Sequence, residues 1–210
     1  MAKIHTVIFD LDGTLSDSAI LTMAAFQRIL PNYSIPVPSI GAVRRTIGHP
    51  NPEFYYILFP KIAHDIVTLI GQEVELMELE ILDSLKNKIL FDGCLELLSQ
   101  LYNNGMQLHI ASTGDKEHVY SILFATGIQN FFSSIYCQSP DKIEMLRMII
   151  GDNEKIGHIM VGDMEKDSDS ARANSIRSVG ACYGYCDKER SDFDYYIDKP
   201  SELWEILEEH

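Results

Sequence analysis

Short apolar runs alternate with segments of helical spacing along most of this 210-residue chain, and this alternation limits the possible folds more than any other feature. The apolar runs predict buried strands, because they are short and are bounded by turn-forming residues. Strands are expected over residues 4–9, 106–111, 134–137, 158–161, 178–183 and 195–197. Helices are expected over residues 93–103, 116–126, 142–150 and 201–209. Strands that alternate with helices form βαβ units, so we expect an α/β fold whose parallel sheet carries helices on both faces.

One long segment, from about residue 16 to residue 90, breaks the alternation and is mainly helical in pattern. Helices are expected over residues 18–30, 39–47 and 62–89, with a proline-containing loop over residues 31–38. We therefore expect a core made of residues 1–15 and 91–210, and a small helical cap domain made of residues 16–90. The glutamates of the longest predicted helix are expected to form a solvated face; they are Glu73, Glu75, Glu78 and Glu80.

Polar residues follow four of the predicted strands directly or after a short loop. Because the carboxyl ends of parallel strands meet at one edge of a sheet, and ligands bind there, we expect these residues to lie together. They are Asp10 and Asp12 after the first strand, Ser112, Thr113 and Gly114 after the second, Lys142 after the third, and Asp163 and Asp167 after the fourth.

Several carboxylates that meet at one edge repel one another unless a cation lies among them. Oxygen ligands suit a hard divalent cation such as Mg²⁺, and a nearby lysine and hydroxyl suit a phosphoryl group that the same metal contacts. A calcium-binding loop of the EF-hand type is excluded, because the twelfth position counted from Asp10 is Leu21 instead of glutamate. The pattern thus favours magnesium-assisted chemistry on a phosphate group.

The motifs resemble those of the haloacid dehalogenase superfamily, and they resemble most closely its phosphoglycolate-phosphatase-like subgroup. The resemblance rests on the sequence DLDGT over residues 10–14, on Ser112, on Lys142 and on GDMEKD over residues 162–167. It covers nearly the whole chain, and it implies a Rossmann-like core with a helical cap inserted after the first strand. It further implies a Mg²⁺-dependent phosphatase that hydrolyses a small phosphorylated metabolite, a phosphoglycolate-like phosphomonoester.

The resemblance implies a role for each catalytic residue. Asp10 is expected to be the nucleophile that forms an aspartyl-phosphate intermediate. Asp12 is expected to protonate the leaving alcohol and then to activate water. Ser112 would hydrogen-bond the transferring phosphoryl group, and Lys142 would stabilise its charge. Because an alkoxide leaving group needs a proton and a halide does not, Asp12 favours phosphate esters over haloacids as substrates.

The resemblance also implies the metal ligands and the place where substrates are selected. Mg²⁺ is expected to be held by the carboxylate of Asp10, by the backbone carbonyl of Asp12 and by Asp163, directly or through water. Asp167 either joins these ligands or supports them. Candidate substrate contacts come from the cap and from the second motif; they are Arg44, Arg45, His49, Thr113 and Gly114. Asp115 stands where relatives often carry a basic residue, and it disfavours a highly anionic substrate. His118, one turn further along, is expected at the surface.

The composition limits the partners of the chain. Its formal net charge of −14 disfavours nucleic acid and anionic membrane surfaces. The N-terminal apolar stretch is interrupted by Asp10 and Asp12, so we expect no signal peptide and a cytoplasmic location. A monomer or weak homodimer is expected. Two other functions stay open: a phosphosugar mutase of the same superfamily, and a non-catalytic module that binds phosphorylated ligands or proteins.

Overall fold

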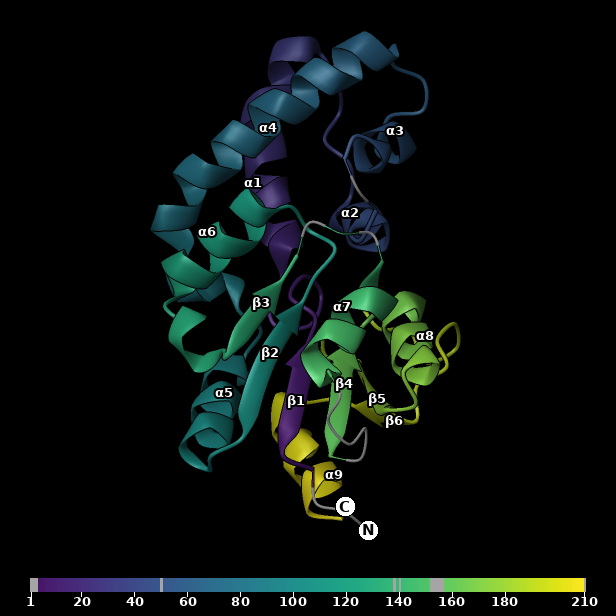
Figure 1. The fold of residues 1–210 in the computed structure, drawn as a ribbon. Coiled ribbons are helices and arrows are strands. Elements are labelled where there is room, and N and C mark those ends of the chain that lie inside the picture. The colour runs from purple at the N-terminus through teal and green to yellow at the C-terminus, as the bar shows by residue number, and fades with distance from the viewer. Residues whose placement is uncertain (1–3, 50, 138, 140, 152–156, 210) are drawn as a thin grey trace.

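The computed structural model describes residues 4–49, 51–137, 139, 141–151 and 157–209. Its centre is a six-stranded parallel sheet with the strand order β3-β2-β1-β4-β5-β6 (Figure 1). The strands are β1 (Thr6–Phe9), β2 (Gln107–Ala111), β3 (Ser134–Tyr136), β4 (His158–Gly162), β5 (Arg177–Ala181) and β6 (Tyr195–Ile197). The expected α/β fold with a Rossmann-like parallel sheet is confirmed.

Alternate residues of the central strand β1 face two separate hydrophobic layers. Val7 and Phe9 contribute to the larger layer, while Ile8 contributes to the smaller one, as the two-residue period of a strand requires. The larger layer includes apolar residues of α5 (Cys94–Asn103), α6 (Lys116–Thr126) and α9 (Leu203–Glu208). The smaller layer includes residues of α7 (Lys142–Ile150) and α8 (Glu165–Ala173). Helices therefore cover both faces of the sheet.

The helical segment between β1 and α5 lies beyond the end of the sheet where the chain leaves β1 (Figure 1). It consists of α1 (Ser18–Ile29), the 3₁₀ turn η1 (Leu30–Tyr33), α2 (Ile40–Thr46), α3 (Glu53–Leu58), α4 (His64–Leu85) and the 3₁₀ turn η2 (Lys86–Ile89). Its interior contains aromatic side chains, including Phe26 and Phe59, whose rings meet edge to face with centroids 5.6 Å apart. That residues 16–90 act as a separate cap domain stays a prediction.

Several boundaries differ from the sequence expectations. The helix expected over residues 62–89 ends at Leu85, because Lys86 has a φ of 47°, which a continuing right-handed helix cannot accommodate. The helix α3 was not expected, since it has only six residues. Nor was α8, because its sequence EKDSDSARA contains too few apolar residues to show a helical period. Within the described part of the chain, no helix is both long and apolar enough to cross a membrane.

Candidate active site

Three buried aspartates meet at the carboxyl edge of the sheet. Asp10 follows β1 and Asp163 follows the neighbouring strand β4, while Asp167 lies in the first turn of α8. Each offers one carboxylate oxygen, and these oxygens all lie within 4.8 Å of one another. The three side chains form the acidic triad, and the structure brings them together as the positions of the strands predict.

Lys142, the first residue of α7, joins two members of the acidic triad. Its Nζ lies 2.9 Å from Oδ1 of Asp10 and 2.5 Å from Oδ1 of Asp167. Only 1% of its side chain is exposed. Burial by itself disfavours the ammonium, but the two carboxylates outweigh burial and raise the pKa of Lys142 above its usual range. Lys142 is therefore a fixed positive charge beside Asp10.

One lysine does not balance three carboxylates. Burial, followed by the charge of neighbouring aspartates, raises the pKa of Asp163 well above its ordinary value. Burial likewise raises the pKa of Asp10 to about 6, although Lys142 opposes this shift. When all three are ionised, two negative charges are left uncompensated by Lys142. A divalent cation with a preference for oxygen ligands fits this donor set in both charge and chemistry.

Glycines allow the acidic triad to pack this closely. Gly13 has a φ of 82°, and a Cβ at this position would lie 2.5 Å from Oδ2 of Asp163. A Cβ on Gly162 would lie 2.3 Å from Cγ of Asp167. Thr14, which follows Gly13, donates a hydrogen bond of 2.9 Å from Oγ1 to Oδ1 of Asp163. The glycines of the first and last motifs thus have a direct steric function at the site.

The second motif forms a turn after β2. Ser112 is buried, and its Oγ accepts a hydrogen bond of 3.1 Å from the backbone N–H of Gly114. The hydroxyl of Thr113 accepts a hydrogen bond of 2.6 Å from Nζ of Lys166, which also donates to the backbone carbonyl of Gly48 at 3.0 Å. Lys166 thus joins the second motif to the helical segment. Sequence reasoning did not single out Lys166, because a lysine in the first turn of a helix is ordinarily solvent-exposed.

Asp12 lies apart from the acidic triad and pairs with a histidine. Nε2 of His118 is 3.0 Å from both carboxylate oxygens of Asp12, and 27% of the histidine side chain is exposed. Burial disfavours the imidazolium, but Asp12 raises the pKa of His118 to about 9. The expectation of a surface histidine is therefore wrong. Asp115 caps the N-terminus of α6, which places His118 in its first turn, at the edge where the site lies.

The three candidate contacts from the helical segment differ in their surroundings. Arg44 pairs with Asp17 and lies over the ring of Tyr185, 5.6 Å from its centroid. Arg45 is exposed, and His49 lies at the surface 3.6 Å from a carboxylate oxygen of Glu53. Arg44 is thus already paired with a residue of this chain, whereas Arg45 faces solvent.

The glutamates of α4 do not form a uniform solvated face, because Glu75 and Glu80 are exposed whereas Glu73 and Glu78 are half-buried. The expectation is therefore wrong for two of the four. Glu78 is half-buried and accepts a hydrogen bond of 2.6 Å from the hydroxyl of Thr22. Burial raises its pKa to about 7, while His118 opposes the shift. The long helix expected from the sequence could not reveal this, because the burial of Glu78 comes from α1 and α6 packing against α4.

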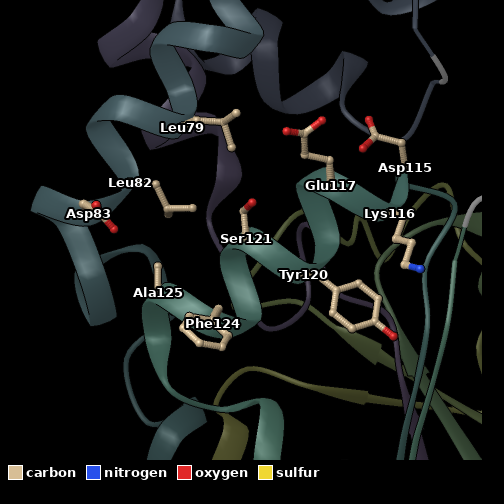
Figure 2. A pocket seen from close by; sticks show the side chains of 10 residues that line it. All are labelled: Leu79, Leu82, Asp83, Asp115, Lys116, Glu117, Tyr120, Ser121, Phe124 and Ala125. Atoms are coloured by element: carbon tan, nitrogen blue, oxygen red, sulfur yellow. The ribbon is translucent and has the colours of Figure 1, made fainter.

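An open groove of about 950 Å³ lies between α4 and α6 (Figure 2). Leu79 and Leu82 line it from α4, and Phe124 lines it from α6, while Glu117 lies nearer the N-terminus of α6. None of its lining residues belongs to the acidic triad. The groove therefore lies outside the acidic triad, although Asp115, which follows the second motif, is among its lining residues.

Fold and site together define an α/β protein with a buried carboxylate cluster and a paired lysine at the carboxyl edge of its sheet. Residues 7–181 match the family of haloacid dehalogenase-like hydrolases. Because this match covers most of the chain, the chain belongs to that family. The resemblance read from the motifs is confirmed, and the matching family is one of hydrolases, as expected.

Several individual proteins are also similar to this chain. The chain is 30% identical to tyrosine-protein kinase PtkA of Mycobacterium tuberculosis over 93% of its own length, and it spans 66% of the length of that protein. It is 26% identical to pyrophosphatase PpaX of Bacillus pumilus, over 98% of this chain and 97% of that one. A crystal structure of a predicted phosphoglycolate phosphatase from Haemophilus somnus superimposes with a TM-score of 0.85 at 21% identity, covering 98% and 99% of the two chains. This last likeness concerns the fold.

Proposed function

We propose that this protein is a Mg²⁺-dependent phosphatase that hydrolyses a small phosphorylated metabolite through an aspartyl-phosphate on Asp10. The observation that carries this proposal is the position of Asp10, which is buried with Asp163 and Asp167 and lies 2.9 Å from the ammonium of Lys142. A carboxylate attacks a phosphate ester slowly because both are negative. A neighbouring ammonium reduces that repulsion and keeps Asp10 ionised.

The first half of the reaction transfers the phosphoryl group to the protein. An oxygen of Asp10 forms a bond to phosphorus, the bond from phosphorus to the ester oxygen breaks, and Asp12 donates a proton to that oxygen. Ser112 and Lys142 would hydrogen-bond the phosphoryl oxygens during the transfer. When bound by Asp10, Asp163, Asp167 and the backbone carbonyl of Asp12, Mg²⁺ supplies further compensation of negative charge.

The second half releases phosphate. Asp12, now a carboxylate, accepts a proton from a water molecule whose oxygen attacks the phosphorus of the aspartyl-phosphate. The bond between phosphorus and the Asp10 oxygen breaks, which restores the carboxylate. In our proposal residues 16–90 act as a cap that selects the substrate, with Arg45, His49, Thr113 and Gly114 as the contacts to test first. The carboxyl groups of Asp115 and Glu78 would repel an anionic leaving group, so we expect a leaving group that is not strongly anionic.

Transfer to an acceptor other than water is the alternative. A phosphosugar mutase would use the same nucleophile and return the phosphoryl group to a sugar phosphate, and the similarity to PtkA adds transfer to a protein hydroxyl. These reactions differ from hydrolysis in a single observable, the acceptor of the phosphoryl group. Release of inorganic phosphate without any added acceptor supports the phosphatase, whereas turnover that requires a bisphosphate primer or a tyrosine acceptor contradicts it.

Replacement of the nucleophile tests the proposal directly. Wild type is expected to hydrolyse p-nitrophenyl phosphate with Mg²⁺ and to stop when a chelator is added. Asp10→Asn removes the negative charge and the nucleophilicity while keeping the shape, so its turnover should fall to the background rate. Asp65→Asn, an exposed aspartate in the first turn of α4, is the matched control and should keep full activity. Equal turnover by wild type and Asp10→Asn would reject Asp10 as the nucleophile.

A further inference from the structure

The pair formed by Asp12 and His118 joins two segments that are distant in sequence. Asp12 lies in the loop after β1, and His118 lies in the first turn of α6. Nε2 is equally distant, at 3.0 Å, from both carboxylate oxygens of Asp12. A donor that faces both oxygens in this way restricts the rotation of the carboxylate about its bond to Cβ.

The other groups beside the Asp12 carboxylate, the hydroxyls of Ser18 and Ser16, act on it less strongly than His118 does. The hydroxyl of Ser16 lies 3.4 Å from Oδ1, near the limit for a hydrogen bond. His118 itself is held from the backbone side, because its N–H donates to Oδ1 of Asp115 at 2.9 Å. Among the residues that the structure describes, His118 is therefore the principal group that fixes the orientation of Asp12.

We propose that His118 is a positioning residue for the acid–base function of Asp12, an inference that rests on the proposed function. General acid catalysis requires the acid to lie within hydrogen-bond reach of the leaving oxygen, so a freely rotating carboxyl group is a poor catalyst. Because His118, against the effect of burial, lowers the pKa of Asp12, the carboxylate must first take up a proton, as it does from water in the second half of the reaction. One oxygen of Asp12 then gives this proton to the leaving oxygen while the other accepts from Nε2. After the transfer, the same N–H stabilises the carboxylate that Asp12 has become.

This role has a signature that a purely structural role lacks. A good leaving group departs without a proton, whereas a poor one needs the general acid. Phenol has a pKa of about 10, like the tyrosine side chain, and nitrophenol is a much stronger acid. Phenyl phosphate and p-nitrophenyl phosphate differ little in shape, so the helical segment should admit both. The ratio of their kcat/KM values therefore reports on Asp12.

The experiment compares both esters in wild type and in His118→Ala. For phenyl phosphate we expect kcat/KM to fall about a hundredfold, the lower end of what a general acid contributes, while the value for p-nitrophenyl phosphate stays close to that of wild type. His118→Gln, whose side-chain amide can replace the Nε2–H donor, should restore much of the loss. Lys116→Gln removes a positive charge from the same turn without contacting Asp12, and it should leave the ratio unchanged.

Several outcomes would overturn the inference. One is an equal loss of kcat/KM on both esters in His118→Ala, and another is no loss of kcat/KM on phenyl phosphate. The third is a kcat/KM of His118→Gln on phenyl phosphate that is no higher than that of His118→Ala. Should His118→Ala fail to fold, as judged by its thermal unfolding, His118→Asn replaces it, since the shorter amide cannot reach Asp12. Failure of the proposed function is distinguishable, because wild type would then hydrolyse neither ester, or Asp10→Asn would hydrolyse both.

Discussion

Gly162 ends β4, and the space beside its Cα is filled by Asp167. Replacement by alanine would place a methyl group 2.3 Å from Cγ of Asp167. Asp167 must then move, and the N–H groups of Asp163 and Met164 would lose their acceptor, as would the ammonium of Lys142. For Gly162→Ala we expect about a hundredfold loss of kcat on p-nitrophenyl phosphate, the scale of a misplaced catalytic group.

The same substitution should also reduce stability, by about 1–3 kcal/mol, because it overpacks a buried site. Chemical denaturation followed by circular dichroism measures this loss. Gly41→Ala is the control: Gly41 lies in α2 with its nearest neighbour the flexible end of Arg45, and alanine favours a helix. If Gly162→Ala keeps the activity and stability of wild type, the expected steric clash with Asp167 does not occur and the prediction is wrong.

Residues could be assigned to the site from the sequence where their position follows from a strand. Asp10, Asp163 and Lys142 follow strands of one parallel sheet, so their meeting needs only the strand order. His118 and Lys166 could not be assigned in this way. Their contacts depend on how α6 and α8 turn about their axes and on where the helical segment lies, and a single sequence carries little information on either.

At the level of the elements, α4 contains a carboxyl group that is costly to ionise. Glu78 has its pKa raised from 4.5 to about 7, chiefly by burial. A raised pKa means that the folded protein binds the proton more tightly than the unfolded chain does. The contribution of Glu78 to stability is thus fully present below about pH 4.5 and is lost as the pH rises through about 7.

Glu78→Gln should therefore raise the thermal unfolding midpoint at pH 8 and change it little at pH 4.5. The amide oxygen can still accept the hydrogen bond from Thr22, so this contact is kept. Glu80→Gln, an exposed neighbour on the same helix, controls for the change in net charge. A midpoint difference that does not depend on pH, or one that Glu80→Gln reproduces, would contradict the assignment.

The elements of the sheet were easier to predict than those of the helical segment. Strand β6 and helices α6 and α7 lie at the residues expected. The two helices have clear end signals in the sequence: each begins after an N-cap aspartate, Asp115 or Asp141, and each ends before a glycine, Gly127 or Gly151. In the helical segment, α3 and the end of α4 lacked such signals. Helix α4 ends at Lys86, which has a positive φ that lysine rarely adopts. A glycine at this position would have predicted the end of the helix.

For the molecule as a whole, the acidic triad should link metal binding to stability. A ligand that binds only the folded state stabilises it, by about 2.7 kcal/mol at a concentration a hundredfold above its Kd. In wild type we expect Mg²⁺ to raise the thermal unfolding midpoint relative to chelator. Asp163→Asn should show little of this increase, since it removes one ligand and one negative charge.

Without Mg²⁺, in the presence of chelator, we expect Asp163→Asn to be more stable than wild type. Because burial and its neighbours raise the pKa of Asp163, its ionised form destabilises the metal-free fold at neutral pH. Asp163→Asn should therefore unfold at a higher temperature than wild type without Mg²⁺. The amide oxygen can still accept from Thr14, so the loss of a hydrogen bond does not mask the effect. A variant that responds to Mg²⁺ as wild type does would exclude Asp163 from the metal site.

The place of β1 in the sheet has a consequence for how the protein is made. β1 is synthesised well before its two neighbours, β2 and β4, which begin only at Gln107 and His158. Pairing of such distant segments closes long loops and is slow, whereas α1 makes its main contacts within the inserted segment, above all with α4. We expect those helices to form on the ribosome while β1 is still unpaired. Asp10 then meets Lys142, Asp163 and Asp167 late in folding, so the nascent chain contains the proposed nucleophile long before the groups around it are in place.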